Sequence, residues 1–322
     1  DAVVVDIGCN DGTLLESFRA PWGARVGFEP NQALALETTA KGFVVSNEMF
    51  SADGFRFLFP NGAKASLITA IAMFYDVDGP LAFCRDVSEI LHPDGLVVVQ
   101  LNDLHSMLTN AAFDIIGHEH LTYWSLGALV HAWNSAGLQI YRVEHNALNG
   151  GSVRLWICHA GMRDADRSVP DQLALERKTL GPGAWQDFEL RMQYVCHRLR
   201  EFVTVTYAEK NIYVLGASTR GNTILQAAGL KYPAIKGASE IHPDKIGRWM
   251  VGTEIPIVSE DEARAKADAF IVLPYSYKAE IIEREKAFLA RGGVLVFPLP
   301  EFEIVAKASW ASNRGGSSKG GT

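Results

Sequence analysis

Residues 3–18 read VVVDIGCNDGTLLESF, in which a β-branched run passes through a glycine turn into apolar residues at helical spacing. Gly8 and Gly12 stand in this first strand-to-helix turn. Because glycine has no Cβ, the backbone of such a turn lets a ligand approach the N-terminus of the helix. The stretch therefore predicts a βα unit with a ligand-binding turn.

The glycine spacing narrows the class of ligand. A dinucleotide turn needs G-x-G-x-x-G, and counting from Gly8 the other two positions are Asn10 and Thr13. The spacing from Asp6 through Gly8 to Gly12 resembles the S-adenosylmethionine (SAM) loop of class I methyltransferases, with Asn10 in place of a frequent middle glycine.

Two acidic residues accompany this turn. Glu29 ends the second predicted strand, where an acid can accept hydrogen bonds from both ribose hydroxyls of a cofactor. Its alternative interpretation is a surface residue beside a tight turn. Asp6 is expected either to contribute, through the residues around it, to binding the methionine ammonium group or to order the loop.

Outward from this turn, β-branched runs alternate with helical patterns. Strands are expected at 2–6, 25–29, 42–46, 65–70 and 95–100, and helices at 13–20, 31–42 and 81–91. This order predicts an open parallel sheet with helices on both faces.

The sheet is expected to end in an antiparallel pair. A helix over about 126–136 precedes LQIYRVEHN (138–146) and SVRLWICHA (152–160), and ALNGG between these runs is a hairpin signal. A reversed edge of this kind is typical of class I methyltransferases, so the order favours that fold over a dehydrogenase domain.

The remaining chain predicts a connector and a second domain. Residues 165–209 have no strand pattern, and 184–210 read as one long amphipathic helix. NIYVLGASTRGNTILQAAGL (211–230) then starts a second βα unit, with strands at 270–274 and 293–298 and a helix over 278–290. The prediction is an α/β chain with a class I methyltransferase Rossmann-like domain (1–164), a helical connector (165–209), a smaller Rossmann-like domain (210–305) and a disordered Gly/Ser-rich tail (306–322).

Composition limits the partners. The 322 residues are 48% apolar and 21% charged, which is ordinary for a globular chain of about two cores. Net charge is −7 with no run rich in Lys or Arg, which favours a small-molecule partner over nucleic acid. No apolar stretch approaches the ~20 residues of a membrane span. The sequence gives no oligomeric state.

The four cysteines (Cys9, Cys84, Cys158 and Cys196) form no C-x-x-C pair, which argues against a zinc knot and a disulfide framework and fits a reducing cytoplasm. The chain opens inside a strand pattern without a methionine or a signal peptide, so we expect a fragment or a chain trimmed at its front.

The second glycine turn, GASTRG (216–221), nearly matches the dinucleotide pattern, with Ser218 at the middle position and Glu240 about 20 residues later. Three interpretations stay open. The turn binds NAD, it is a βα turn with no ligand, or it is an anion site for substrate phosphates with Arg220 nearby.

The triplet His118, Glu119 and His120 lies in FDIIGHEHLTYWS (113–125), after the fifth predicted strand. Its two histidines could chelate a metal, hold loop carbonyls, or work in general acid/base catalysis with Glu119 tuning its neighbour. The position is outside the carboxyl edge of the sheet, where open α/β sheets bind ligands, and this favours catalysis.

Several segments together resemble the nucleotide-sugar C-methyltransferases. They are DIGCNDGTLL, GFEPN, FDIIGHEHLTYWSL, NALNGGSVRLW, LGASTRGNTIL, HPDKIGRWMVGTEIPIVS and FPLPEFEIV, in family order over about residues 1–305. The resemblance implies a SAM-dependent enzyme that methylates C3 of dTDP-4-keto-deoxysugars, with SAM as methyl donor and no metal in this chain. It also implies that the family's N-terminal four-cysteine zinc domain is absent here.

Roles follow from the resemblance by position. His120 would be the base that removes the C3 proton, with Glu119 and His118 beside it, and SAM would bind at Asp6, Gly8, Asn10, Gly12 and Glu29. The family often has Tyr where this chain has Gly117, and often a His after the fourth strand, where this chain offers Tyr75 and Asp76.

The second domain would hold the diphosphate and nucleoside. Its candidate residues are Ser218, Thr219, Arg220, Asn222, Lys245 and Arg248. Tyr123 and Trp124 are expected either to line the sugar pocket or to pack between the domains, and for Trp124 we favour the core.

Three other functions remain open at this point. The chain could be an O- or N-methyltransferase in which His120 deprotonates a hydroxyl, an NAD-binding oxidoreductase that uses residues 216–221, or a non-catalytic nucleotide-binding module. SAM binding and NADH titration discriminate among these classes.

Overall fold

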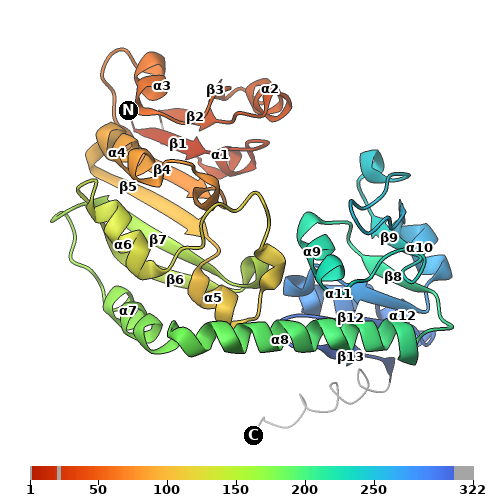
Figure 1. Cartoon of the computed structure of the whole chain (residues 1–322). Helices are drawn as coiled ribbons and strands as arrows, with labels where there is room; N and C mark the ends of the chain where they lie inside the picture. The colour runs from red at the N-terminus through yellow and green to blue at the C-terminus, as the bar shows by residue number, and fades with distance from the viewer. Residues whose placement is uncertain (1, 20–22, 308–322) are drawn as a thin grey trace, which may run out of the picture. The chain divides into compact units, whose positions relative to one another are not determined.

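The computed structural model describes residues 2–19 and 23–307, which form two compact units (Figure 1). Unit 1 contains the chain up to His105 and the stretch Glu119–Gly181, whereas unit 2 contains Ser106–His118 and the chain from Pro182 onward. The segment predicted as a disordered tail falls outside the described residues from 308 onward.

The sheet of unit 1 has the order β3-β2-β1-β4-β5-β7-β6. Its strands are β1 (Val3–Ile7), β2 (Ala24–Phe28), β3 (Val44–Ser46), β4 (Ala65–Ile71), β5 (Leu91–Leu101), β6 (Leu138–Asn146) and β7 (Ser152–His159). β1 to β5 are parallel, and β7 pairs antiparallel with both β5 and β6. This order and the reversed edge confirm the predicted class I methyltransferase fold.

Helices cover the two faces of this sheet unevenly. One face packs against α3 (Ala52–Leu58), α4 (Pro80–Ile90) and α6 (Leu126–Asn134), whose apolar residues complete the large core of unit 1. On the other face, α1 (Thr13–Ser17) and α2 (Gln32–Ala40) lie beside β1 to β3, where Cys9, Leu15 and Phe43 form a small separate cluster.

The second face of the sheet is hollowed along β4, β5 and β7. Alternate residues of these strands line a cavity of about 690 Å³, which also reaches Gly8 and α1. The prediction of helices on both faces is therefore correct near β1 to β3, and along β4, β5 and β7 the sheet lines this cavity instead.

Polar side chains begin many of these helices. The side chain at the N-cap accepts backbone N–H groups in α2, α3, α6, α9 (Thr219–Ala227) and α10 (Glu260–Lys266). Such caps satisfy donors that have no partner inside the helix, so they fix where each helix starts. The capping residues are Asn31, Ser51, Ser125, Ser218 and Ser259.

The predicted connector is two helices, α7 (Ser168–Thr179) and α8 (Pro182–Glu201), and α8 continues into a π-helical turn at Phe202–Thr206. α7 belongs to unit 1, because Val169 enters its core and Glu176 accepts the backbone N–H of Leu126 and of Gly127. The boundary predicted at 164 is therefore too early by the length of this helix.

Unit 2 is built on a six-stranded sheet of order β10-β9-β8-β11-β12-β13. Its strands are β8 (Ile212–Leu215), β9 (Gly237–Glu240), β10 (Ile257–Ser259), β11 (Ala269–Val272), β12 (Val294–Phe297) and β13 (Glu303–Val305), and β13 alone pairs antiparallel. The helix predicted over 278–290 is divided into α11 (Lys278–Arg284) and α12 (Lys286–Ala290). This confirms a second, smaller Rossmann-like sheet.

One segment belongs to unit 2 although the chain on both sides of it belongs to unit 1. α5 (Leu104–Thr109) begins in unit 1, and Ser106–His118 packs in unit 2, where the short turn Phe113–Ile115 lies against α9. The boundary between the units therefore falls inside the H-E-H triplet, between His118 and Glu119.

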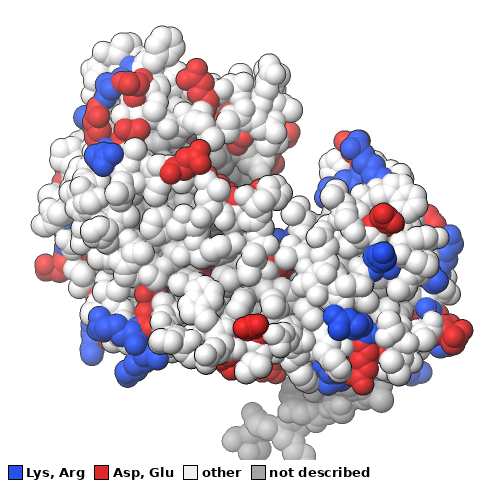
Figure 2. Space-filling model, in the orientation of Figure 1, with Lys and Arg blue, Asp and Glu red and all other residues white. Residues whose placement is uncertain are grey.

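Among the described residues, no helix is long and apolar enough to cross a membrane. All four cysteines are buried and unpaired. Figure 2 shows that, on the visible face, the described Lys and Arg side chains lie scattered among Asp and Glu.

Candidate functional site

The first glycine turn has the backbone that its residues predict. Gly8 and Gly12 have φ of +71° and +80°, and Asn10 has φ of +51°. A Cβ on Gly12 would lie 2.7 Å from Thr38 Cγ2, so a side chain there is excluded by both strain and contact. Thr38 in turn donates its hydroxyl to Asn10 O at 2.8 Å.

Glu29 closes this turn at the end of β2. Its side chain is nine-tenths buried, and its two oxygens accept the backbone N–H of Asn10 at 3.0 Å and of Asn31 at 2.9 Å. Each carboxylate oxygen has a second lone pair, so Glu29 can still accept ligand hydroxyls while it holds the loop. The alternative of a surface Glu29 is wrong.

A cavity of about 460 Å³ opens directly onto Gly8 and Glu29. Phe28, Phe50 and Phe83 supply aromatic walls, and Phe50 stands edge-on to the other two rings at 5.2 and 5.4 Å. The volume is within the range of small-molecule sites. The remaining lining residues are Ile7, Pro30, Met49, Met73, Asp76, Val77, Asp78, Gly79, Ala82 and Asp86.

Asp6 lies on the other side of the turn, in the wall of the 690 Å³ cavity. It is only 3% exposed and accepts the Thr69 hydroxyl at 2.6 Å. Burial raises the pKa of Asp6 to about 6, and the hydrogen bond from Thr69 opposes this rise. A nearby cation would therefore stabilise the ionised carboxylate.

These residues fit S-adenosylmethionine. The glycines leave the backbone open where a Cβ would intrude, Glu29 offers acceptors for ribose hydroxyls, and the aromatic cavity suits an adenine ring. Sequence reasoning missed Met49, Phe50 and Phe83. Their position after β3 and on α4 becomes visible only once the strand order is known.

Tyr75 and Asp76 follow β4 at the same edge of the sheet. Asp76 lines the 460 Å³ cavity, where desolvation, with a further contribution from the Glu119 charge, raises its pKa to about 6. Tyr75 is buried, and its carbonyl accepts the backbone N–H of Leu121 at 3.0 Å and of Thr122 at 3.2 Å. The chain after the H-E-H triplet is thus fixed beside this cavity.

His120 is half-buried against this support. Its ring centroid lies 4.2 Å from that of Tyr75 and 6.4 Å from that of Tyr123. Trp124 is buried 5.3 Å from Phe74 in the core of unit 1, which confirms the core interpretation of that residue.

The other members of the triplet are exposed. His118 and Glu119 face solvent, and a Cβ on Gly117 would meet nothing within 4 Å. Within residues 2–19 and 23–307, no three His, Cys, Asp or Glu side chains are grouped as a metal site.

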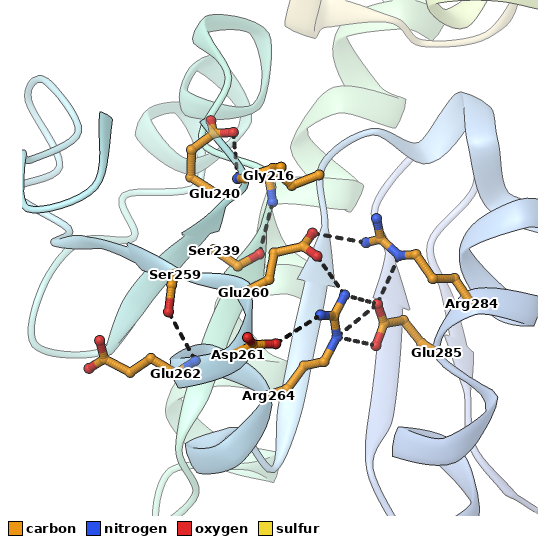
Figure 3. Close-up of polar contacts among 11 residues, drawn as sticks. Gly216, Ser239, Glu240, Ser259, Glu260, Asp261, Glu262, Arg264, Arg284 and Glu285 are labelled. Atoms are coloured by element: carbon orange, nitrogen blue, oxygen red, sulfur yellow. Dashed lines mark hydrogen bonds and ion pairs between the residues drawn. The ribbon is translucent and has the colours of Figure 1, made fainter. Parts of the chain in front are cut away.

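The second glycine turn has a similar place in unit 2 but other partners (Figure 3). Gly216 has φ of +91°, and its N–H donates to Ser239 O at 3.2 Å and to Ser239 Oγ at 3.4 Å. Ser218 caps α9 by accepting the N–H of Gly221 at 3.1 Å. Ser218 and Thr219 are exposed at the start of that helix.

Glu240 ends β9, as Glu29 ends β2. One of its oxygens accepts the N–H of Ile241 at 2.8 Å and of His242 at 3.1 Å, and the other accepts Lys245 Nζ at 3.1 Å. Although burial opposes it, these hydrogen bonds lower the pKa of Glu240. Lys245 therefore has a protein partner, while Arg248 is exposed.

Two further predicted substrate residues also have protein partners. Asn222 donates to Val251 O at 2.7 Å and accepts the Thr253 hydroxyl at 3.0 Å. Arg220 Nη2 lies 2.6 Å from Asp114 Oδ2 and 3.3 Å from the Tyr275 hydroxyl. Roles of Asn222 and Arg220 toward a phosphate stay predictions.

Unit 2 also contains an ion network, centred on one buried carboxylate, that the sequence did not indicate (Figure 3). Glu285 is almost fully buried and pairs with Arg264 at 2.8 Å and Arg284 at 3.0 Å, while Arg264 also binds Glu260 at 2.7 Å. These residues join α10 to α11 and α12, so the network holds the framework of unit 2.

Comparison with known proteins covers both units. Residues 1–143 match the model of a methyltransferase domain, and residues 147–300 match that of a C-methyltransferase C-terminal domain. The C-methyltransferase NovU of Streptomyces niveus is 30% identical over 312 residues, which cover 95% of this chain and 74% of that protein.

Solved structures are more distant. A complex of the Haloferax volcanii Trm112 methyltransferase activator with a methyltransferase gives a TM-score of 0.39 at 16% identity, over 49% of this chain and 83% of that one. A SAM-dependent methyltransferase of Clostridium acetobutylicum gives a TM-score of 0.38 at 11% identity, over 50% of this chain and 85% of that one.

The two domain matches and the relative that spans nearly the whole chain identify the protein as a SAM-dependent methyltransferase that belongs to the C-methyltransferase family.

Proposed function

We propose that this enzyme methylates C3 of a nucleotide-linked 4-keto-deoxysugar, with His120 as the base. The observation that carries this proposal is the contact of the His120 ring with Tyr75, whose neighbour Asp76 lines the 460 Å³ cavity. A titratable imidazole at that place is beside the candidate cofactor site.

The chemistry requires a base and little else from the triplet. A C–H bond next to a ketone is a weak acid, so His120 takes the C3 proton while the electron pair passes toward the C4 oxygen. When bound, SAM supplies a sulfonium-activated methyl group for that carbon. Glu119 and His118 are adjacent to the base in the sequence and are exposed.

The resemblance to nucleotide-sugar C-methyltransferases supplies the substrate class. The start of α9, with Ser218 and Thr219, takes the diphosphate in this proposal, because helix N-termini favour anions. Tyr123 lies near His120 and serves the sugar, and the exposed Arg248 and Lys245 supply positive charge.

Proton exchange tests the role of His120 apart from methyl transfer. A dTDP-4-keto-deoxysugar is incubated with the enzyme in D₂O with S-adenosylhomocysteine, and deuterium at C3 is followed by NMR. We expect exchange with the native chain and a loss of about 10²- to 10⁴-fold in His120→Gln, with SAM affinity retained.

His118→Gln is the matched variant, two residues away and exposed, and we expect at most a several-fold effect. Exchange at an undiminished rate in His120→Gln contradicts the proposed base. Methyl transfer to oxygen instead of C3, seen in the product spectrum, contradicts C-methylation.

A further inference from the structure

The segment that enters the H-E-H triplet is fastened to unit 2 at its beginning. Arg191 of α8 donates Nη1 to Thr109 O at 2.7 Å and to Leu108 O at 3.4 Å. The carbonyls at the end of α5 thereby gain a charged partner, which favours a single path for the chain after this helix.

A second and stronger fastening follows at Asp114. Its side chain is 2% exposed, Oδ2 pairs with Arg220 Nη2 at 2.6 Å, and Oδ1 accepts the Tyr275 hydroxyl at 2.9 Å. Burial raises the pKa of Asp114, while Arg220 and Tyr275 oppose this rise. Both carboxylate oxygens are therefore held in a fixed direction, one by the partly buried Arg220 and the other by the buried Tyr275.

Beyond this point the chain has little support from packing. Ile116, Gly117, His118 and Glu119 are exposed, and Gly117 has open space where a Cβ would stand. The next backbone bonds are those of Leu121 and Thr122 to the Tyr75 carbonyl. Residues 115–120 thus connect Asp114, which is held within unit 2, to Leu121, which is held within unit 1, and His120 is the last residue of this span.

We propose that Asp114, held by Arg220 and Tyr275, is a positioning residue that fixes the chain entering the H-E-H triplet and so orients the His120 imidazole. This inference rests on the proposed role of His120. Releasing one end of a short exposed span gives each residue in it more conformational freedom, and the base then spends less time in the productive orientation.

The same cluster also supports the proposed diphosphate site. Arg220 is the second residue of α9, directly after Thr219, so the start of that helix and the entry to the triplet share one ion pair. The charge of Arg220 is thus used inside the protein, and its neighbours Ser218 and Thr219 remain exposed toward solvent.

The test compares three variants in the C3 exchange assay and in SAM titration. Tyr275→Phe removes one hydroxyl and keeps the ring, Asp114→Asn removes the charge and keeps the shape, and Glu285→Gln is the control. Glu285 is a buried carboxylate of unit 2 that is paired with two arginines but not with residues 106–118.

We expect the exchange rate per folded molecule to fall about 10-fold in Asp114→Asn and about 3-fold in Tyr275→Phe, with SAM affinity within 2-fold of native. Glu285→Gln should lower the melting temperature without lowering exchange. If Asp114→Asn does not fold, Tyr275→Phe carries the test. A folded variant with native exchange overturns the inference.

A second change separates positioning from mere stability. Gly117→Ala restricts the span without filling occupied space, so combined with Tyr275→Phe it should restore part of the lost exchange. No restoration by Gly117→Ala argues that the span is not what the cluster controls and overturns the inference. If His120→Gln retains exchange, the proposed base itself fails, whatever the result at Asp114.

Discussion

The two glycine turns of this chain occupy the same place in two sheets of related order, yet their surroundings differ. In unit 1, Glu29 holds the loop and still faces a cavity of about 460 Å³. In unit 2, Glu240 accepts hydrogen bonds from the backbone of its own turn and from Lys245, while Arg220 pairs with Asp114. The same βα architecture thus borders an open cavity in unit 1, and in unit 2 it binds a neighbouring segment.

The difference extends to the pKa values of acids at the two turns. Asp6 has a raised pKa because it is buried with only one hydroxyl donor, whereas hydrogen bonds from two N–H groups and Lys245 lower the pKa of Glu240 against its partial burial. A carboxylate that is left poorly satisfied in the free protein is suited to a cationic ligand. SAM carries such a charge on its sulfonium and ammonium groups.

The largest expected effect concerns the ion network of unit 2. Glu285→Ala removes the carboxylate that Arg264 and Arg284 share. It should cost about 3 kcal/mol of unfolding free energy, the lower end for a broken buried pair, because both arginines are partly exposed and still contact Glu260. Chemical denaturation monitored on both units measures this loss. SAM affinity should be unchanged, and a loss of SAM binding by the folded variant would remove the distinction between the units.

The glycines give the next effect. Gly12→Ala and Gly221→Ala should each destabilise the protein by about 1 to 3 kcal/mol, since the new Cβ would lie 2.7 Å from Thr38 Cγ2 in one and 2.6 Å from Leu273 Cβ in the other. Calorimetric titration with SAM distinguishes the two variants. Only Gly12→Ala should weaken SAM binding, and an equal loss in Gly221→Ala would break the comparison.

The pH dependence of stability should have opposite signs at the two turns. The folded protein favours the protonated form of Asp6. The stability that Asp6 contributes is therefore complete at low pH and is lost as the pH rises from about 4 through about 6. That loss is about 2 to 3 kcal/mol. Glu240 has a lowered pKa, so its contribution is present above about pH 4.5 and is lost as pH falls below that value.

Melting curves from pH 3 to 8 check these signs. Asp6→Asn should remove the decline between about pH 4 and 6, and Glu240→Gln should remove part of the loss at lower pH. An unchanged decline in Asp6→Asn would assign it to another group.

The smallest effect is expected at Thr69. Thr69→Val removes the hydroxyl that lowers the pKa of Asp6, so SAM affinity near pH 6 should fall about 2- to 5-fold and recover at pH 8. Titration at the two pH values measures it. Equal losses at both would indicate a packing effect instead.

Most strands of both sheets and the first glycine turn could be predicted from the sequence. β-branched periodicity located β1 to β8, β11 and β12 within a few residues. The spacing from Asp6 to Gly12 together with Glu29 predicted the turn that we propose for the cofactor. The strands β9 (GASE), β10 (IVS) and β13 (EIV) were missed because these short segments lack a longer apolar run of the kind seen in β8, β11 and β12.

The partners of Arg220 could not be predicted in the same way. Asp114 lies 106 residues before Arg220, and such a pairing is set by tertiary packing. A signal did exist, because an acid within AAFDIIG stands in an apolar run, and a buried carboxylate requires a partner. The identity of that partner needed the fold.

The most direct measurement is SAM binding by calorimetry to the native chain, Glu29→Ala and Glu240→Ala, repeated with dTDP. The two variants remove the same group from the same topological position in each sheet. We predict that Glu29→Ala weakens SAM binding at least about 10-fold and that Glu240→Ala leaves it native, with dTDP bound by native and Glu29→Ala chains alike. SAM binding that survives in Glu29→Ala, or is lost in Glu240→Ala, would contradict the assignment of the cofactor to the first turn.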